Sequence, residues 1–234
     1  KSFLKTAVFI AVCWLPHFIA RYPGIVTVDS EISLLQYYGV TEYTTQHPII
    51  YMQLLGRFAD LGNWLGSVSL GLFFLLLIQC VILLLAMTYM VDTMKKFHMP
   101  AWLLNTTLVI IGFAPCFTGY IAAFVIDVFY DAFIVLFIIE LVWYLFKPEV
   151  YFSSWKHPAC TIAAVLGMFF RKNGIYVVAV VLLFVAGREL YMILHKKQSM
   201  RAALIFLAFL FLPMCVGKIN DAALYKKYDA KKIS

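Results

Sequence analysis

Asp29 and Glu31 are the first residues in this sequence whose type and position suggest chemistry. They follow the first apolar run, in the stretch VDSE of a polar segment over residues 21–48 that is rich in tyrosine. A carboxylate at a water–lipid boundary can act as a general base by taking a proton from a hydroxyl group. The apolar residues around Asp29 predict a short surface helix that partly shields it from water. We expect Asp29 to be this base and Glu31 to position substrate; the alternative is two solvated loop acids.

His47-Pro48 marks the start of the next helix, because proline suits the first helical turn, where its missing N–H has no partner. We interpret His47 as a substrate contact beside Asp29, or else as a capping or interfacial histidine. Residues 49–65 have apolar side chains at helical spacing together with Arg57 and Asp60. This pattern predicts an interfacial helix.

Asp127 and Asp131 lie four residues apart in IDVFYDAF, and therefore on one face of a helix. Ionised groups in a membrane span are costly and usually face a polar cavity. We expect both to bind substrate, although solvation near the end of the span is the simpler alternative. Glu140 lies deeper in the same apolar run, where it is either protonated or paired between helices, and we assign it no function.

Arg171, Lys172 and Asn173 form the tip of a predicted hairpin, because Asn173-Gly174 is a turn signal between two apolar runs. Two adjacent cations can anchor a helix to lipid headgroups. They can also bind a phosphate together with the free N–H groups at the start of the next helix. We include all three residues in a substrate-binding site, to which Arg57 can add a further positive charge.

The composition excludes a soluble protein. Hydrophobic residues make up 64% and charged residues 13% of the 234 residues, whereas about 25% charged residues are usual in soluble domains. The net charge of +7 comes from short basic clusters between apolar runs, which excludes a nucleic-acid partner. The five cysteines fall singly within apolar runs, without metal-ligand spacing, and are expected to be small buried side chains.

The apolar runs predict an all-α, polytopic transmembrane protein. A spanning helix needs about 20 mostly apolar residues, and interfacial helices are expected in the first outer loop. Residues 1–217 form one transmembrane module, and residues 218–234 are expected to be a polar tail that begins a further carboxy-terminal part. About seven spans are predicted, near residues 3–20, 67–91, 101–119, 124–146, 158–170, 174–194 and 202–217.

The basic residues between the spans predict the orientation. Lysines and arginines accumulate in cytoplasmic loops, and most basic residues fall on one side of the membrane if the spans alternate. The other, extracytoplasmic side then receives the loop over residues 21–48, the acidic start of the fourth span and the Arg171–Asn173 tip. The basic residues on the predicted cytoplasmic side are Lys1, Lys5, Lys95, Lys96, Lys147, Lys156, Arg188, Lys196, Lys197 and Arg201.

Four stretches in this order resemble the GT-C superfamily of membrane glycosyltransferases, which use polyprenyl-phosphate-linked sugars. VDSE resembles the acidic motif after the first span of that superfamily, and QHPIIYMQLLG resembles the helix opening of its bacterial members, with HPII in place of HPP. IDVFYDAF resembles their acidic fourth-span motif, and FFRKNGIYV is similar to the Arg-x-Asn-Gly hairpin of one bacterial branch. The resemblance extends from Lys1 to Gly217.

The resemblance implies an inverting glycosyltransferase of the cell envelope, a multi-pass cell-membrane protein that acts at the outer face of the membrane. Asp29 would be the catalytic base, and Arg171 and Lys172, with Arg57, would stabilise the departing polyprenyl phosphate. The partners implied are the lipid-linked sugar donor and membrane lipid. No cofactor is required. If a divalent cation takes part, Asp29, Glu31 and Asp127 would be oxygen ligands suited to Mg²⁺ or Mn²⁺.

Two other functions fit the same hydropathy. A transporter or flippase of a lipid-linked or anionic solute would place its binding groups near the midplane, often within repeated halves. Here the polar residues gather at one face and no repeat is visible, which favours the enzyme. A non-catalytic subunit of an envelope-assembly complex would leave the acidic loop and the basic hairpin tip without a role.

Overall fold

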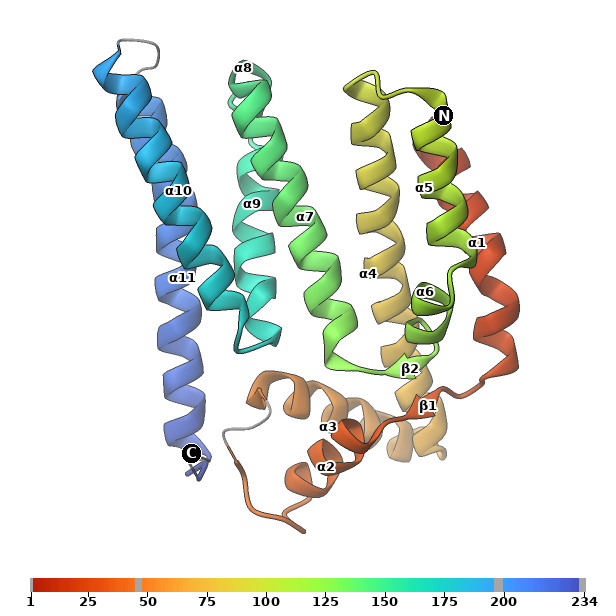
Figure 1. Ribbon diagram of the computed structural model, residues 1–234. Helices are drawn as coiled ribbons and strands as arrows, with labels where there is room; N and C mark the ends of the chain where they lie inside the picture. Colours follow the sequence, from red (N-terminus) through yellow and green to blue (C-terminus); the bar gives the residue numbers. More distant parts are fainter. Residues whose placement is uncertain (1, 45–47, 196–199, 232–234) are drawn as a thin grey trace.

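The computed structural model describes residues 2–44, 48–195 and 200–231, and it confirms an all-α, polytopic membrane protein (Figure 1). Within these ranges, six helical segments are long and apolar enough to cross a membrane. The third consists of α5 (Ala101–Phe113) and the short α6 (Pro115–Tyr120). The other five are α1 (Ser2–Ala20), α4 (Val68–Lys96), α7 (Ile126–Phe146), α10 (Gly174–Leu194) and α11 (Met200–Lys227).

The span expected at residues 158–170 is a shorter element. The connection α8 (Pro148–Tyr151) leads into α9 (Lys156–Gly167), which ends in the 3₁₀ turn η1 (Met168–Phe170). This apolar helix is too short to count among the six. It packs between α7 and α11 and still carries the chain from one end of the bundle to the other (Figure 1). At its polar beginning, Lys156 is exposed, whereas His157 is buried against neighbouring helices.

Two helices lie across one end of the bundle, as Figure 1 shows: α2 (Val28–Tyr37) and α3 (Ile49–Trp64). They confirm the short helix expected around Asp29 and the helix expected over residues 49–65. The Tyr37 and Tyr38 hydroxyls donate to Asp60 at 2.6 Å and 3.0 Å, which holds α2 against α3. We name this end of the molecule the α2–α3 face.

A two-residue strand pair ties the α2–α3 face to the start of α7. Strand β1 (Ile25–Val26) runs parallel to β2 (Ala123–Phe124). Directly after β1, the Thr27 hydroxyl caps α2 by accepting from the Ser30 N–H, and it also donates to the Phe124 carbonyl at 2.9 Å. The Ser30 hydroxyl donates to the same carbonyl. Segments almost a hundred residues apart are therefore joined by backbone hydrogen bonds.

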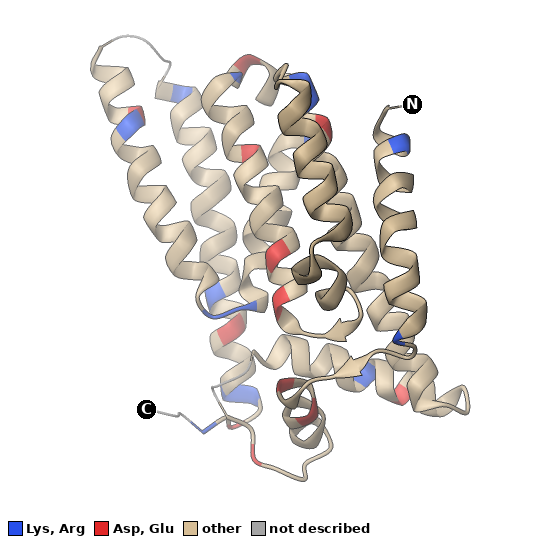
Figure 2. Ribbon diagram, turned by 45° about the vertical axis from the view of Figure 1, so that its right-hand side comes forward, with Lys and Arg blue, Asp and Glu red and all other residues tan. Residues whose placement is uncertain are grey.

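Contacts at the opposite end agree with alternating spans. Lys95 Nζ, at the end of α4, donates to Ser2 Oγ at 3.2 Å and Thr6 Oγ1 at 2.8 Å on α1. Lys147, after α7, donates to the Lys96 carbonyl at 3.5 Å. Figure 2 shows that the charged residues lie mainly toward the two ends of the helices. The two ends are distinct, as expected, and the cytoplasmic location of this basic end stays a prediction.

The segment expected to be a polar tail begins as a helix, because α11 continues through Lys227. The residues directly after α11 are held against the chain between α2 and α3. The rings of Tyr43 and Tyr228 lie 5.3 Å apart, and Lys231 Nζ lies 2.6 Å from Glu42 Oε2. The carboxy-terminal end of α11 therefore contributes to the α2–α3 face.

Candidate functional site

Asp29 and Glu31 lie in the first turn of α2, where the unpaired N–H groups of a helix favour negative charge. Both side chains are exposed. The partial shielding that we expected for Asp29 is therefore wrong, because Thr27 and Ser30 turn the other side of α2 toward the Phe124 carbonyl. Within the described ranges, neither acid forms an ion pair.

Tyr51, on α3, is buried, with 2% of its surface exposed. The Ser30 hydroxyl is close to it but donates to Phe124, so the Tyr51 hydroxyl has no hydrogen-bond partner among the described residues. Burial raises the pKa of Tyr51 above its ordinary value; Ser30 opposes this shift, and the charges of Asp127 and Asp29 increase it. The pKa of one buried hydroxyl is therefore raised by acids from two different helices, α2 and α7.

Asp127 is paired with Arg171, although 44 positions separate them in the sequence. Arg171 Nη1 lies 3.0 Å from Asp127 Oδ1, with side chains 45% and 24% exposed respectively. The Arg171 guanidinium also lies 5.7 Å from the centre of the Tyr130 ring. Asp131 is half-buried one turn further along α7, and among the described residues the ion-pair partner of Arg171 is Asp127. The predicted acidic face and basic tip are thus brought together, through Asp127.

Lys172 lines a cavity of about 630 Å³ between the start of α10 and the second half of α11. Its Nζ lies 5.5 Å from the centre of the Tyr225 ring. Burial lowers the pKa of Lys172, and the charge of Asp221 opposes this shift. We name this space the basic cavity, and its charged lining residues are Arg171, Lys172, Lys218 and Asp221.

Arg57 lines a different cavity, of about 430 Å³, together with Lys227 and Tyr228. A smaller cavity of about 160 Å³ shares Asn220 with the Arg57 cavity and Asp221 with the basic cavity. Arg57 therefore lies along the same α3–α11 interface as Arg171 and Lys172, but it is not brought beside them.

Asn173 precedes α10 and is exposed, and its side chain makes no cap hydrogen bond. The turn that it forms with Gly174 is tight. A Cβ atom on Gly174 would lie 2.1 Å from the Met168 carbonyl oxygen, so only glycine fits this approach. The predicted hairpin turn is confirmed, and it fixes where Arg171 and Lys172 project.

His47 lies outside the described residues. The adjacent Pro48 is buried at the start of α3 and lines the basic cavity. In the part of the chain that the structure describes, no three His, Cys, Asp or Glu residues are grouped closely enough to hold a metal ion. Asp29, Glu31 and Asp127 therefore do not form a ready ligand set.

Glu140 is paired between helices, as one of our two interpretations expected. It is fully buried, and its Oε2 lies 2.8 Å from His157 Nδ1 on α9. Its other oxygen accepts from the Tyr89 hydroxyl on α4 at 2.8 Å. Sequence analysis missed His157 and Tyr89, because neither lies in a sequence motif that would indicate a polar partner on another helix.

Sequence analysis also missed three residues of the α2–α3 face: Tyr51, Lys218 and Asp221. Tyr51 occurs in an ordinary amphipathic pattern, and Lys218 and Asp221 lie in the segment interpreted as a tail. One available signal was their helical spacing, since residues three apart share a face of a helix. That signal places Lys218 and Asp221 on one side of an extended α11.

Comparison with known proteins identifies a family. Neither a curated protein nor a solved structure matches this chain. A family of unknown function, DUF6020, matches residues 38–223, a segment that begins directly after α2 and includes Asp127, Arg171 and Lys218. Because this match spans more than half of the sequence, the chain belongs to the DUF6020 family.

Proposed function

We propose that this protein is an inverting, GT-C-type glycosyltransferase that uses a polyprenyl-phosphate sugar donor at the extracytoplasmic face of the cell membrane. One observation carries the proposal. The basic cavity is lined by Arg171, which is paired with Asp127, and the charges of Asp127 and Asp29 both raise the pKa of the buried Tyr51. Cations suited to a phosphate and carboxylates suited to an acceptor hydroxyl thus occur at the same end of the molecule.

The basic cavity is suited to the donor phosphate. Arg171, Lys172 and Lys218 supply three positive charges against the single carboxylate of Asp221. Charge-assisted hydrogen bonds from such cations are the strongest that a protein offers to phosphate. Tyr176 and Ile175 provide aromatic and apolar surface beside them, which suits the first units of a polyprenyl chain.

Asp29 is the better base, because Asp127 is already engaged by Arg171. In the proposed reaction, Asp29 takes the proton of the acceptor hydroxyl. At the same time, the acceptor oxygen forms a bond to the anomeric carbon of the donor sugar. The bond from that carbon to the phosphate oxygen breaks, and its electron pair leaves with the polyprenyl phosphate. Arg171, Lys172 and Lys218 stabilise the charge that develops there.

The test is turnover of a labelled polyprenyl-phosphate sugar by the full-length natural protein in proteoliposomes. We expect release of polyprenyl phosphate that falls about tenfold or more in Lys218→Gln, since one charge-assisted contact is lost. Lys226→Gln is the matched control, because Lys226 lies on the same helix but does not line the basic cavity. Equal turnover in both variants and the wild type would show that the cavity does not hold the donor.

One observation favours a second candidate, a transporter or flippase of an anionic or lipid-linked solute. Glu140 is a fully buried acid within the bundle, bonded to His157 and Tyr89, and ionisable groups within membranes often serve proton-linked transport. Solute flux into proteoliposomes that is lost in Glu140→Gln, without any sugar transfer by the wild type, would favour this function over the enzyme.

A further inference from the structure

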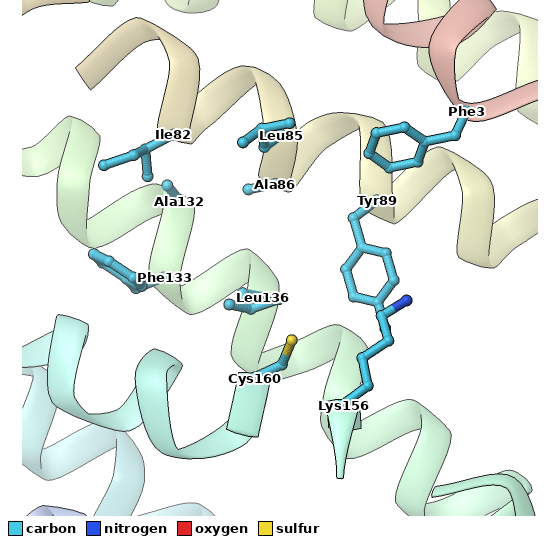
Figure 3. A pocket seen from close by; sticks show the side chains of 10 residues that line it. All are labelled: Phe3, Ile82, Leu85, Ala86, Tyr89, Ala132, Phe133, Leu136, Lys156 and Cys160. Carbon is cyan, nitrogen blue, oxygen red and sulfur yellow. The ribbon is translucent and has the colours of Figure 1, made fainter. Parts of the chain in front are cut away.

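A further cavity runs from the middle of the bundle to its basic end, away from the α2–α3 face. It has a volume of about 320 Å³, in the range of small-molecule sites, and lies between α1, α4, α7 and α9. Figure 3 shows Ile82, Ala132 and Phe133 together toward one end and Lys156 and Tyr89 toward the other. The cavity thus has a long apolar part and a single cationic end.

The cationic end is held in place by the buried network around Glu140. The Tyr89 hydroxyl donates to Glu140, which is also bonded to His157, so the Tyr89 ring is fixed. Lys156 Nζ lies 5.0 Å from the centre of that ring. Among the described residues, Lys156 has no carboxylate within ion-pair distance, and its side chain is exposed.

We propose that this cavity binds an anionic phospholipid, with an acyl chain along the apolar wall and the headgroup at Lys156. Basic pockets between membrane helices at the cytoplasmic side are suited to anionic headgroups, and Lys156 lies at the predicted cytoplasmic end. Leu85, which lines the cavity, is 48% exposed, so an acyl chain can enter from the surrounding lipid. This site is independent of the proposed transferase function.

Charge complementarity selects an anionic over a zwitterionic lipid. Lys95, Lys96 and Lys147 add positive charge at the same end of the bundle, although Lys96 is paired with Asp92 at 2.8 Å. The buried Glu140 carboxyl is bonded to Tyr89 and His157, so it leaves Lys156 available to a ligand. A neutral lipid would fill the apolar wall but leave the Lys156 ammonium without a partner.

The first test is a native mass-spectrometry titration of the full chain in neutral detergent, with phosphatidylglycerol and with phosphatidylcholine of the same acyl chains. We expect tighter binding of phosphatidylglycerol by the wild type. Lys156→Gln should weaken it about fivefold, the effect of one lysine near anionic lipid, and Lys156→Arg should retain it. Lys5→Gln, at the same end but outside the cavity, is the control and should bind like the wild type.

The second test locates the lipid. Cys160 lines the cavity, and in Figure 3 its sulfur atom points into it. In a variant whose other cysteines are replaced by alanine, phosphatidylglycerol should slow the reaction of Cys160 with a maleimide, and Leu85→Trp should remove this protection by filling the cavity. Equal binding of the two lipids, equal losses in Lys5→Gln and Lys156→Gln, or no protection of Cys160 would each overturn the proposal.

Discussion

Asp29 and Asp127 lie in the first turns of two different helices, in two different electrostatic settings. Asp29 is exposed at the start of α2 and has no ion-pair partner within the described ranges. Asp127, at the start of α7, is 24% exposed and lies 3.0 Å from Arg171. The charges of both carboxylates raise the pKa of Tyr51.

This difference separates two roles that carboxylates perform in transferases. A carboxylate bound to a guanidinium is fixed in place and accepts hydrogen bonds already, so it orients its partner. A carboxylate without such a partner is free to receive a proton from a substrate. Under the proposed function, proton transfer therefore falls to Asp29, and Asp127 orients Arg171.

The largest expected effect is that of Asp29→Asn, which keeps the size of the side chain but removes proton acceptance. Sugar transfer from a polyprenyl-phosphate donor should fall by about 10²–10⁴-fold, as is typical for a lost general base. Thermal stability should stay near wild type because Asp29 is exposed. Glu31→Gln is the matched control and should reduce transfer much less. Loss of transfer in Asp127→Asn with full activity in Asp29→Asn would reverse the assignment.

The next effect is on binding of the donor phosphate. Arg171→Ala should weaken binding of a polyprenyl phosphate by about 1.5–3 kcal/mol, the contribution of a hydrogen bond to a charged group. Asp127→Asn should leave this binding intact or strengthen it, because it frees Arg171 from its carboxylate partner. Calorimetric titration of both variants measures the difference. Unchanged binding in an Arg171→Ala/Lys172→Ala double variant would reduce the pair to an anchor for lipid headgroups.

A smaller effect, on stability, is expected for Tyr51, whose pKa both acids raise. Its hydroxyl is buried without a partner among the described residues, and an unsatisfied buried polar group costs about 1–3 kcal/mol. Tyr51→Phe should therefore be as stable as the wild type or more stable, by thermal unfolding monitored with circular dichroism. A clear loss of stability would show that the hydroxyl is bonded to a group outside the described residues.

The smallest effect is a pH dependence of the contact between α2 and α3. The hydrogen bond to Asp60 raises the pKa of Tyr37 from 10.0 to about 12, with burial adding to this shift. A raised pKa means that the contact stabilises the fold fully below about pH 10 and is lost as the pH rises through about 12. Tyr37→Phe should cost about 0.5–1 kcal/mol at neutral pH, because the site is largely exposed. Denaturant titrations should show this difference vanishing at high pH; a difference that is constant with pH would contradict it.

The apolar runs were sufficient to predict the helices, since a bilayer core requires about 20 apolar residues per span. They were insufficient for α9, where Lys156 is exposed but the next residue, His157, is buried against other helices. Hydropathy measures suitability for lipid and takes no account of burial within protein. The same limitation explains why hydropathy predicts a tail at residues 218–227, where the structure has the end of α11.

Alternation of the spans was enough to predict that Asp29, Asp127 and Arg171 share one end of the molecule. It could not predict the Arg171–Asp127 pair, because cations at the tip of the hairpin between α9 and α10 can equally contact lipid headgroups. Nor could it predict the exposure of Asp29, which depends on Thr27 and Ser30 bonding to a carbonyl about a hundred residues away. Local pattern determines which end a residue reaches, and long-range hydrogen bonds determine what it faces there.

The pairing of β1 with β2 has a consequence for how the protein responds to bilayer thickness. Helices tilt when the hydrocarbon layer becomes thinner or thicker than their apolar length. Asp29 and Asp127 follow strands that are bonded to each other at Ile25–Ala123 and Val26–Phe124, so tilting of α1 or α7 carries both acids together. The spacing of these two carboxylates is therefore set by peptide groups at the membrane surface and is insulated from changes in lipid chain length.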